Sequence, residues 1–190
     1  MRVKSMACAI VSLAAAAFAV SPVAFAQTGI AAKGELKRGE YLVNFGGCND
    51  CHTPKVMTPN GPEPDKSRLL SGHPAGAQLP PVPAGVIGPN PNQWGALTNN
   101  DLTAWAGPWG ISFAANLTPD ATGMSGWTSD LFIKTMRTGK HFGVGPPVLP
   151  PMPWFALAAL TDQDLKAVFA YLKSVKPIKN QVPKPIPPGN

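Results

Sequence analysis

The sequence of 190 residues is poor in cysteine. It has three, and Cys8 lies in an N-terminal apolar run, so only Cys48 and Cys51 remain for the rest of the chain. A framework of several disulfides is therefore excluded. After the N-terminal run, no stretch approaches the roughly 20 apolar residues of a membrane-spanning helix. The formal net charge is +6, but no run of lysines and arginines follows, which argues against a nucleic-acid-binding surface.

The N-terminal residues have the order of a secretory signal peptide. Arg2 and Lys4 form a short basic start, an apolar run follows from Met6 to Val20, and Ala24-Phe25-Ala26 offers small residues for cleavage before Gln27. An uncleaved membrane anchor is the alternative, but the apolar run is short for a span and is interrupted at Pro22. The sequence therefore predicts that residues 1–26 are removed, that the mature chain lies in the periplasm, and that it has no transmembrane span.

The two remaining cysteines stand in the segment CNDCH, residues 48–52. In an exported protein such a pair can form a disulfide, act as a thioredoxin-like redox pair, or contribute half of a zinc site. A zinc site lacks its second Cys/His pair here, and the residues before Cys48 do not have the pattern of a strand, which a thioredoxin-like motif requires.

The pattern C-x-x-C-H is also the attachment signature of c-type haem. Two thiols about one helical turn apart can each form a thioether with one of the two vinyl groups of the porphyrin. The adjacent histidine then supplies the proximal nitrogen of the iron. The sequence thus predicts one covalently bound haem c, held by Cys48, Cys51 and His52, with His52 as an iron ligand.

The second axial ligand is predicted to be Met152, in the segment LPPMPWF. Prolines on both sides hold this backbone extended and stiff, which suits a loop that presents a thioether to a metal. His141 and an open site remain the alternatives. The remaining candidates are less well placed. Met57 is too near His52, Met136 is expected in the core face of a helix, Met124 lies in a loop, and His73 lies in the Pro/Gly-rich segment.

Three helices are predicted. The first covers about 35–46 and contains Gly39, for which a close helix crossing is expected because glycine costs a helix about 1 kcal/mol. The second covers WTSDLFIKTMRTGK, with Thr128 as its N-cap and Gly139 at its end. The third covers LTDQDLKAVFAYLKSVKP, with Thr161 as its N-cap, Asp164 three residues later and Pro177 after its end.

Strand patterns are scarce, and residues 54–110 are crowded with proline and glycine. Trp94, Trp105 and Trp109 are costly to leave in water, so this segment is expected to pack as an irregular lid. The predicted organisation is a signal peptide at 1–26, one domain at 27–176 with an insertion at 54–110, and an extended, proline-rich tail at 177–190.

The order of these segments resembles that of class I c-type cytochromes, in particular proteobacterial ones that serve periplasmic dehydrogenases. The resemblance covers residues 35–55 and 111–176, including the helix before CNDCH, the segment NLTPDATGMSGW, the LPPMPW loop and the AYLK of the last helix. It implies a mainly α, cytochrome c fold of three or more helices around one covalent haem, with a long irregular Pro/Gly-rich insertion. It also implies that Val168 and Tyr171 pack on Gly39, and that Asn116 and Trp127 contact the haem edge.

The predicted function is that of a periplasmic monohaem electron carrier and not an enzyme. It would take single electrons from a dehydrogenase-type donor and pass them to a respiratory acceptor, such as a terminal oxidase or another cytochrome. The alternatives are a cytochrome subunit of a larger dehydrogenase complex, and a haem enzyme or sensor with an open sixth site. An apolar shell around the haem is expected from Val43, Phe45, Leu131, Phe155 and Phe169. Four lysines are candidates for docking an acidic partner, although each alone can simply be a solvated surface residue: Lys37, Lys55, Lys140 and Lys173.

Overall fold

A computed structural model describes residues 23–188 of the chain. Helices dominate, in the order α1 (Val23–Phe45), α2 (Cys48–His52), α3 (Ser129–Thr138), the short 3-10 turn η1 (His141–Gly143), α4 (Trp154–Leu157) and α5 (Asp162–Ser174). The signal peptide predicted for 1–26 lies mostly outside the described residues.

The three predicted helices are confirmed, and two have the predicted caps. The Thr128 side chain accepts a hydrogen bond from the Leu131 amide at the start of α3, and Gly139 ends that helix in the left-handed conformation at φ 64°. At the start of α5, the Thr161 side chain accepts from the Asp164 amide. The first helix begins earlier than predicted, at Val23, and ends at Phe45.

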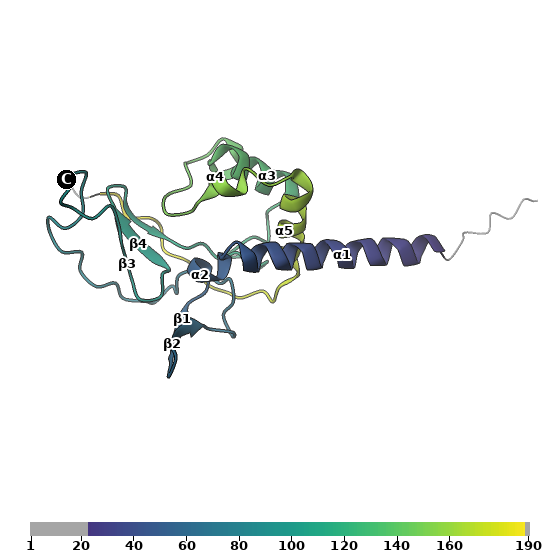
Figure 1. The fold of residues 1–190 in the computed structure, drawn as a ribbon, viewed down its shortest axis with the longest axis horizontal. Helices are drawn as coiled ribbons and strands as arrows, with labels where there is room; N and C mark the ends of the chain where they lie inside the picture. The colour runs from purple at the N-terminus through teal and green to yellow at the C-terminus, as the bar shows by residue number, and fades with distance from the viewer. Residues whose placement is uncertain (1–22, 189–190) are drawn as a thin grey trace, which may run out of the picture.

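Helices α1 and α5 cross in close contact, as Figure 1 shows. A Cβ atom on Gly39 would lie 2.0 Å from the Ala167 carbonyl oxygen and 2.8 Å from the Tyr171 Cβ. The predicted crossing at Gly39 and its contact with Tyr171 are confirmed. The nearest contact is with the Ala167 backbone, so the two helices approach backbone to backbone there, and the neighbouring Val168 is buried in the core.

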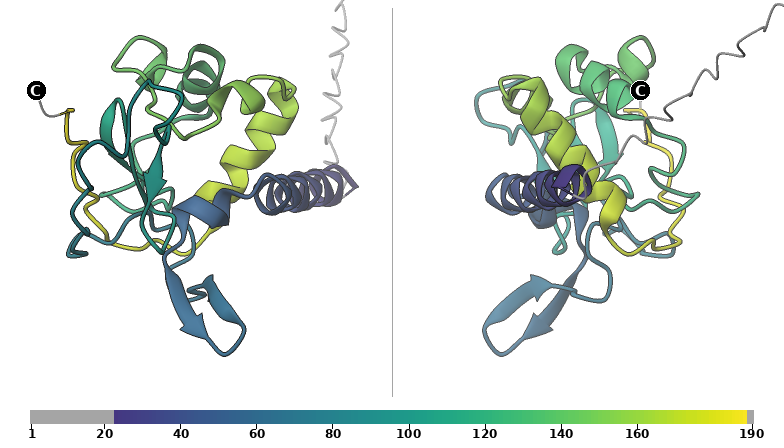
Figure 2. Two further views of the ribbon diagram at one scale, coloured as in Figure 1. Left: turned by 60° about the vertical axis from the view of Figure 1, so that its left-hand side comes forward. Right: turned by 90° about the vertical axis from the view of Figure 1, so that its right-hand side faces the viewer.

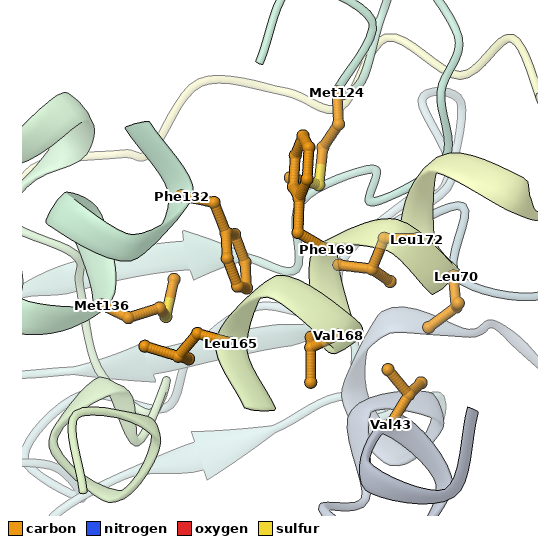
Figure 3. Packing of buried hydrophobic residues seen from close by; sticks show 9 residues of the cluster. All are labelled: Val43, Leu70, Met124, Phe132, Met136, Leu165, Val168, Phe169 and Leu172. Atoms are coloured by element: carbon orange, nitrogen blue, oxygen red, sulfur yellow. The ribbon is translucent and has the colours of Figure 1, made fainter. Parts of the chain in front are cut away.

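One hydrophobic core joins α1, α3, α5 and the loop residues between them (Figure 3). Its buried members are Val43, Leu70, Met124, Phe132, Met136, Leu165, Val168, Phe169 and Leu172. Met136 is thus a core residue, as predicted, and so is Met124, for which the sequence indicates only a loop position. Within residues 23–188, no helix combines the length and the apolar composition that crossing a membrane would require.

The prediction of an irregular insertion is wrong in part, because this region forms two small antiparallel sheets. Strands β1 (Lys55–Thr58) and β2 (Gly61–Pro64) make a hairpin that projects from the body, as the two views in Figure 2 show. Strands β3 (Leu97–Thr98), β4 (Ala104–Gly107) and β5 (Gly110–Phe113) form a three-stranded sheet. These strands are two to four residues long, so they carry too little alternation of apolar and polar residues to be recognised.

The tryptophans of the insertion differ in burial. Trp105 and Trp109 are half-buried and donate through their indole nitrogens to Leu102 and Ser112, at 2.9 and 3.1 Å. Trp94 is 68% exposed, so the expectation that it packs against the body of the protein is wrong. The remainder of the insertion, between β2 and β3, is irregular as expected.

Candidate haem-attachment site

The CNDCH segment forms its own short helix, α2, set off from α1 by a turn at Gly46 and Gly47. Gly47 adopts the left-handed conformation, with φ 66°, and this sharp reversal separates the two helices. The helical spacing places Cys48 and Cys51 one turn apart, on neighbouring positions of the same face. The following His52 is the last residue of the helix.

His52 is buried, with 9% of its surface exposed. Its Nδ1 lies 2.8 Å from the carbonyl oxygen of Ala115, which can only accept a hydrogen bond. Nδ1 therefore carries the proton, and the lone pair is on Nε2. Burial lowers the pKa of His52, and the hydrogen bond to Ala115 opposes this only in part. The ring is thus held as the neutral tautomer whose Nε2 can bind a metal.

Both cysteines are free thiols in the structure. Burial raises the pKa of Cys48 to about 11 and raises that of Cys51 as well. Reactive redox cysteines have a lowered pKa, so these thiols differ from a thioredoxin-like pair. Because Cys48 packs against the hydrophobic core, its thiol is placed for a buried apolar partner rather than for exchange with solvent thiols.

Hydrogen bonds from both the backbone and the Thr53 side chain connect the end of α2 to the 70–73 loop. Thr53 is fully buried, and its hydroxyl donates to the Asn49 side chain at 2.7 Å and accepts from the Leu70 amide at 2.8 Å. The Gly72 amide donates to the His52 carbonyl at 2.8 Å. The loop 70–73 thus holds the carboxyl end of α2 in place.

Met152 lies in the loop between η1 and α4 and is half-buried against the same core as Cys48. The structure therefore brings the predicted attachment helix and the predicted methionine loop to one core. Of the alternative ligands, Met57 is 77% exposed on the hairpin, and His141 is exposed. His73 is fully buried and hydrogen-bonded to Thr103 at 2.8 Å through Nδ1.

The five residues predicted to form an apolar shell around the haem differ in burial. Phe45 is 79% exposed and stacks on Tyr41 at the surface, and Phe155 is 67% exposed. Val43 and Phe169 are buried in the core, and Leu131 is half-buried. Phe45 is the last residue of α1 and Phe155 lies in the four-residue helix α4, where the direction of a side chain cannot be deduced from a repeating pattern.

Asn116 does not have a free amide for a ligand. Its Nδ2 donates to the Ile178 carbonyl at 2.8 Å, and its Oδ1 accepts from the amide and the hydroxyl of Thr118 at 3.0 and 2.7 Å. These bonds tie the NLTPD loop to the C-terminal segment. Trp127 packs against the core and against Phe142, at 4.6 Å between ring centroids.

Two lysines that were candidates for docking have internal hydrogen bonds. Lys55 donates to carbonyls at the end of α2, and Lys173 donates to the carbonyls of Met124 and Ser125 at 3.0 and 2.9 Å. Neither was recognised as structural from the sequence, because a hydrogen bond to a distant carbonyl has no sequence signal. The Ala115 carbonyl that orients His52 was missed for the same reason.

The residues at α2 fit a covalent haem. Cys48 and Cys51 offer two half-buried thiols one helical turn apart. His52 offers a neutral imidazole whose Nδ1 donates to Ala115, so that Nε2 remains available to bind iron. Burial raises the pKa of both thiols, so they are held protonated and unpaired at the start of the attachment segment.

Comparison with known proteins finds similarity to cytochrome subunits of dehydrogenases. A cytochrome c subunit of gluconate 2-dehydrogenase from Pantoea cypripedii is 29% identical over 145 residues, which is 75% of this chain and 24% of that protein. The cytochrome c subunit of a quinone alcohol dehydrogenase from Gluconobacter oxydans is 28% identical over 149 residues, 77% of this chain and 23% of that protein. The cytochrome subunit of fructose dehydrogenase from Gluconobacter japonicus is 36% identical over 83 residues, 43% of this chain and 17% of that protein.

The chain therefore spans about a quarter or less of the length of these relatives. No family model matches it. All three relatives are named as cytochrome subunits of dehydrogenases, in agreement with the resemblance that the sequence predicted. Over about three quarters of its length, the chain is thus similar to cytochrome c subunits of dehydrogenases.

Proposed function

We propose that this chain is an exported electron-transfer cytochrome with a cytochrome c fold and a single covalent haem c. Cys48 and Cys51 form the two thioethers, and His52 and Met152 are the axial ligands. Haem iron with both axial positions filled supplies one-electron redox chemistry and has no open position for a substrate. The function is transfer of single electrons, with a dehydrogenase as the donor.

The observation that carries this proposal is the state of His52. Its Nδ1 donates to the Ala115 carbonyl, so the ring is oriented and the lone pair of Nε2 is free, on the same short helix as two protonated thiols. Oriented imidazoles of this kind are typical of metal ligands. The names of the relatives support a cytochrome that works with a dehydrogenase.

The test is expression of the full chain in a bacterial periplasm that contains the haem-attachment machinery. We expect a red protein whose haem stays bound after denaturation, with one haem per chain by pyridine haemochrome analysis. Colourless protein with two free thiols would refute the proposal. Loss of the leader during export, measured by the mass of the intact protein, tests cleavage after Ala26.

The ligand role of Met152 is tested separately by Met152→Ala. We expect this variant to lose the weak far-red band of methionine-ligated ferric haem and to gain carbon monoxide binding in the ferrous state. Met57→Ala is the matched control, because Met57 is 77% exposed on the hairpin, and we expect no change. Carbon monoxide binding by the unaltered protein would instead favour a haem enzyme or sensor.

A second candidate role is that of a subunit in a larger dehydrogenase complex, favoured by the subunit names of the relatives. Purification of the tagged chain from its native periplasm distinguishes the two roles. A stoichiometric catalytic subunit would support the complex, and a monomeric cytochrome would support the independent carrier.

A further inference from the structure

The Lys55 side chain folds back from the first residue of β1 toward the carboxyl end of α2. Its ammonium nitrogen lies 2.6 Å from the Thr53 carbonyl oxygen, 2.8 Å from that of Asp50 and 3.2 Å from that of Asn49. Three carbonyl oxygens of the attachment segment therefore meet one cation, which is half-buried.

These contacts supply donors to carbonyls at the end of this helix and at its C-cap residue, Thr53. The last carbonyls of any helix have no partner within it. Here the carbonyl of His52 accepts from Gly72, and those of Asn49, Asp50 and Thr53 accept from Lys55. A positive charge at a helix carboxyl end is also favourable with respect to the helix dipole.

The same nitrogen lies 3.4 Å from the carbonyl oxygen of Asp101, which belongs to the loop between β3 and β4. Lys55 therefore joins the attachment helix to the sheet of the insertion. Burial lowers the pKa of Lys55, and the negative charges of Asp50 and Asp101 oppose this in part. Asp50 is exposed, so water screens its charge more than the half-buried charge of Lys55.

We propose that Lys55 is a positioning residue for the haem-attachment helix, and that its fixed charge at the carboxyl end of the helix that carries His52 favours the ferrous state and so raises the reduction potential. This inference rests on the proposed function. A cation held near the iron is more compatible with Fe(II) than with Fe(III), because it repels the added positive charge of the oxidised centre.

The experiment compares Lys55→Met, Lys55→Gln and Lys55→Arg in the full chain, exported and loaded with haem. Methionine keeps an unbranched apolar side chain without charge or donor, glutamine keeps a donor without charge, and arginine keeps both. Lys37→Met is the matched control, since Lys37 is exposed on α1 and has no side-chain hydrogen bond or ion pair among residues 23–188. The measurements are the haem content and the midpoint potential from a spectroscopic redox titration.

We expect a lower potential for both neutral variants, a value near that of the unaltered protein for Lys55→Arg, and no shift for Lys37→Met. Haem-loaded Lys55→Met with an unchanged potential would overturn the inference. If a neutral variant does not acquire haem, amide hydrogen exchange is compared between the haem-free variant and the haem-free unaltered chain to test the positioning role. Faster exchange confined to α2 and the 101–104 loop supports the positioning role, and exchange equal to that of the unaltered chain refutes it. A colourless unaltered protein would refute the proposed function itself and is thus a separate result.

Discussion

Two buried histidines in this chain have different surroundings, and this difference distinguishes His52, the proposed iron ligand, from His73, whose contacts are structural. His52 donates from Nδ1 to a carbonyl, so its tautomer is defined. The Nδ1 of His73 lies 2.8 Å from the Thr103 hydroxyl, which can accept or donate, and its Nε2 is buried without a hydrogen-bond partner among the described residues. The His73 ring packs on Phe113, at 4.9 Å between centroids. Its neighbours are those of a core side chain.

The burial of His73 predicts a pH dependence of stability. Burial lowers its pKa from the ordinary 6.5, so the unfolded chain binds a proton in a range where the folded chain does not. The contribution of neutral His73 to the free energy of unfolding is therefore fully present above about pH 6.5, and this contribution is lost as the pH falls below that value. We expect the free energy of unfolding to fall less steeply between pH 7 and pH 5 in His73→Gln than in the unaltered chain.

Denaturant unfolding at several pH values measures this difference. His141→Gln is the control, because His141 is an exposed histidine. Equal pH slopes for His73→Gln and the unaltered chain would contradict the assignment. The comparison isolates His73, since His52 is present in all of these proteins.

At the scale of secondary-structure elements, the crossing of α1 and α5 depends on the absence of a side chain at Gly39. This position faces the Ala167 backbone, so a Cβ atom there would collide with α5. A Cβ atom on Gly34, in the same helix, would meet no other segment of residues 23–188 within 4 Å. Substituting Gly39 therefore tests the helix crossing, and substituting Gly34 tests the intrinsic helix preference of the same helix.

Gly39→Ala should destabilise the fold by about 2 kcal/mol or more, because the helices must separate to admit the new atom. Gly34→Ala should stabilise it by about 0.5–1 kcal/mol, because alanine is the better helix former. Thermal or denaturant unfolding of the two variants measures both values. A loss of stability in Gly34→Ala equal to that in Gly39→Ala would show that the crossing is not the cause.

The helices of this chain were predictable because their ends carry chemical signals. Thr128, Gly139 and Thr161 are caps with characteristic residue types, and the apolar positions of α5 repeat with the helical period. The hairpin after CNDCH was missed, since Val56 and Met57 are both exposed and no alternation marks a buried face. Of the candidate site, the thiols and His52 could be proposed from their spacing. The roles of Ala115 and Lys55 depend on contacts between distant segments.

At the scale of the whole molecule, the C-terminal segment after α5 ties several loops together. The Asn180 side chain donates to the carbonyls of Ser71 and His73 at 2.7 and 2.9 Å and accepts from the Ala75 amide at 3.0 Å. Further along, Ile186 pairs with Ile111 at the edge of β5. The segment that was predicted as an extended tail thus contacts the loop that holds α2 and the sheet of the insertion.

Asn180→Ala should therefore lower the stability of the whole chain by about 2–3 kcal/mol, because three hydrogen bonds are lost and two partly buried carbonyls lose their donor. Lys184→Ala, an exposed change in the same segment, is expected to have an effect within about 0.5 kcal/mol. Unfolding measured by circular dichroism tests both. Equal stabilities of the two variants would mean that the segment does not restrain the 70–75 loop.

The pairing of α1 with α5 also has a consequence for biogenesis. The ion pair between Arg38 and Asp164, 2.8 Å long, joins residues 126 positions apart, and it belongs to the contact that closes the core. A chain that emerges amino end first exposes CNDCH long before α5 follows. If haem is attached as proposed, the thiols would therefore be accessible to the attachment machinery before α5 packs on α1 and the core closes.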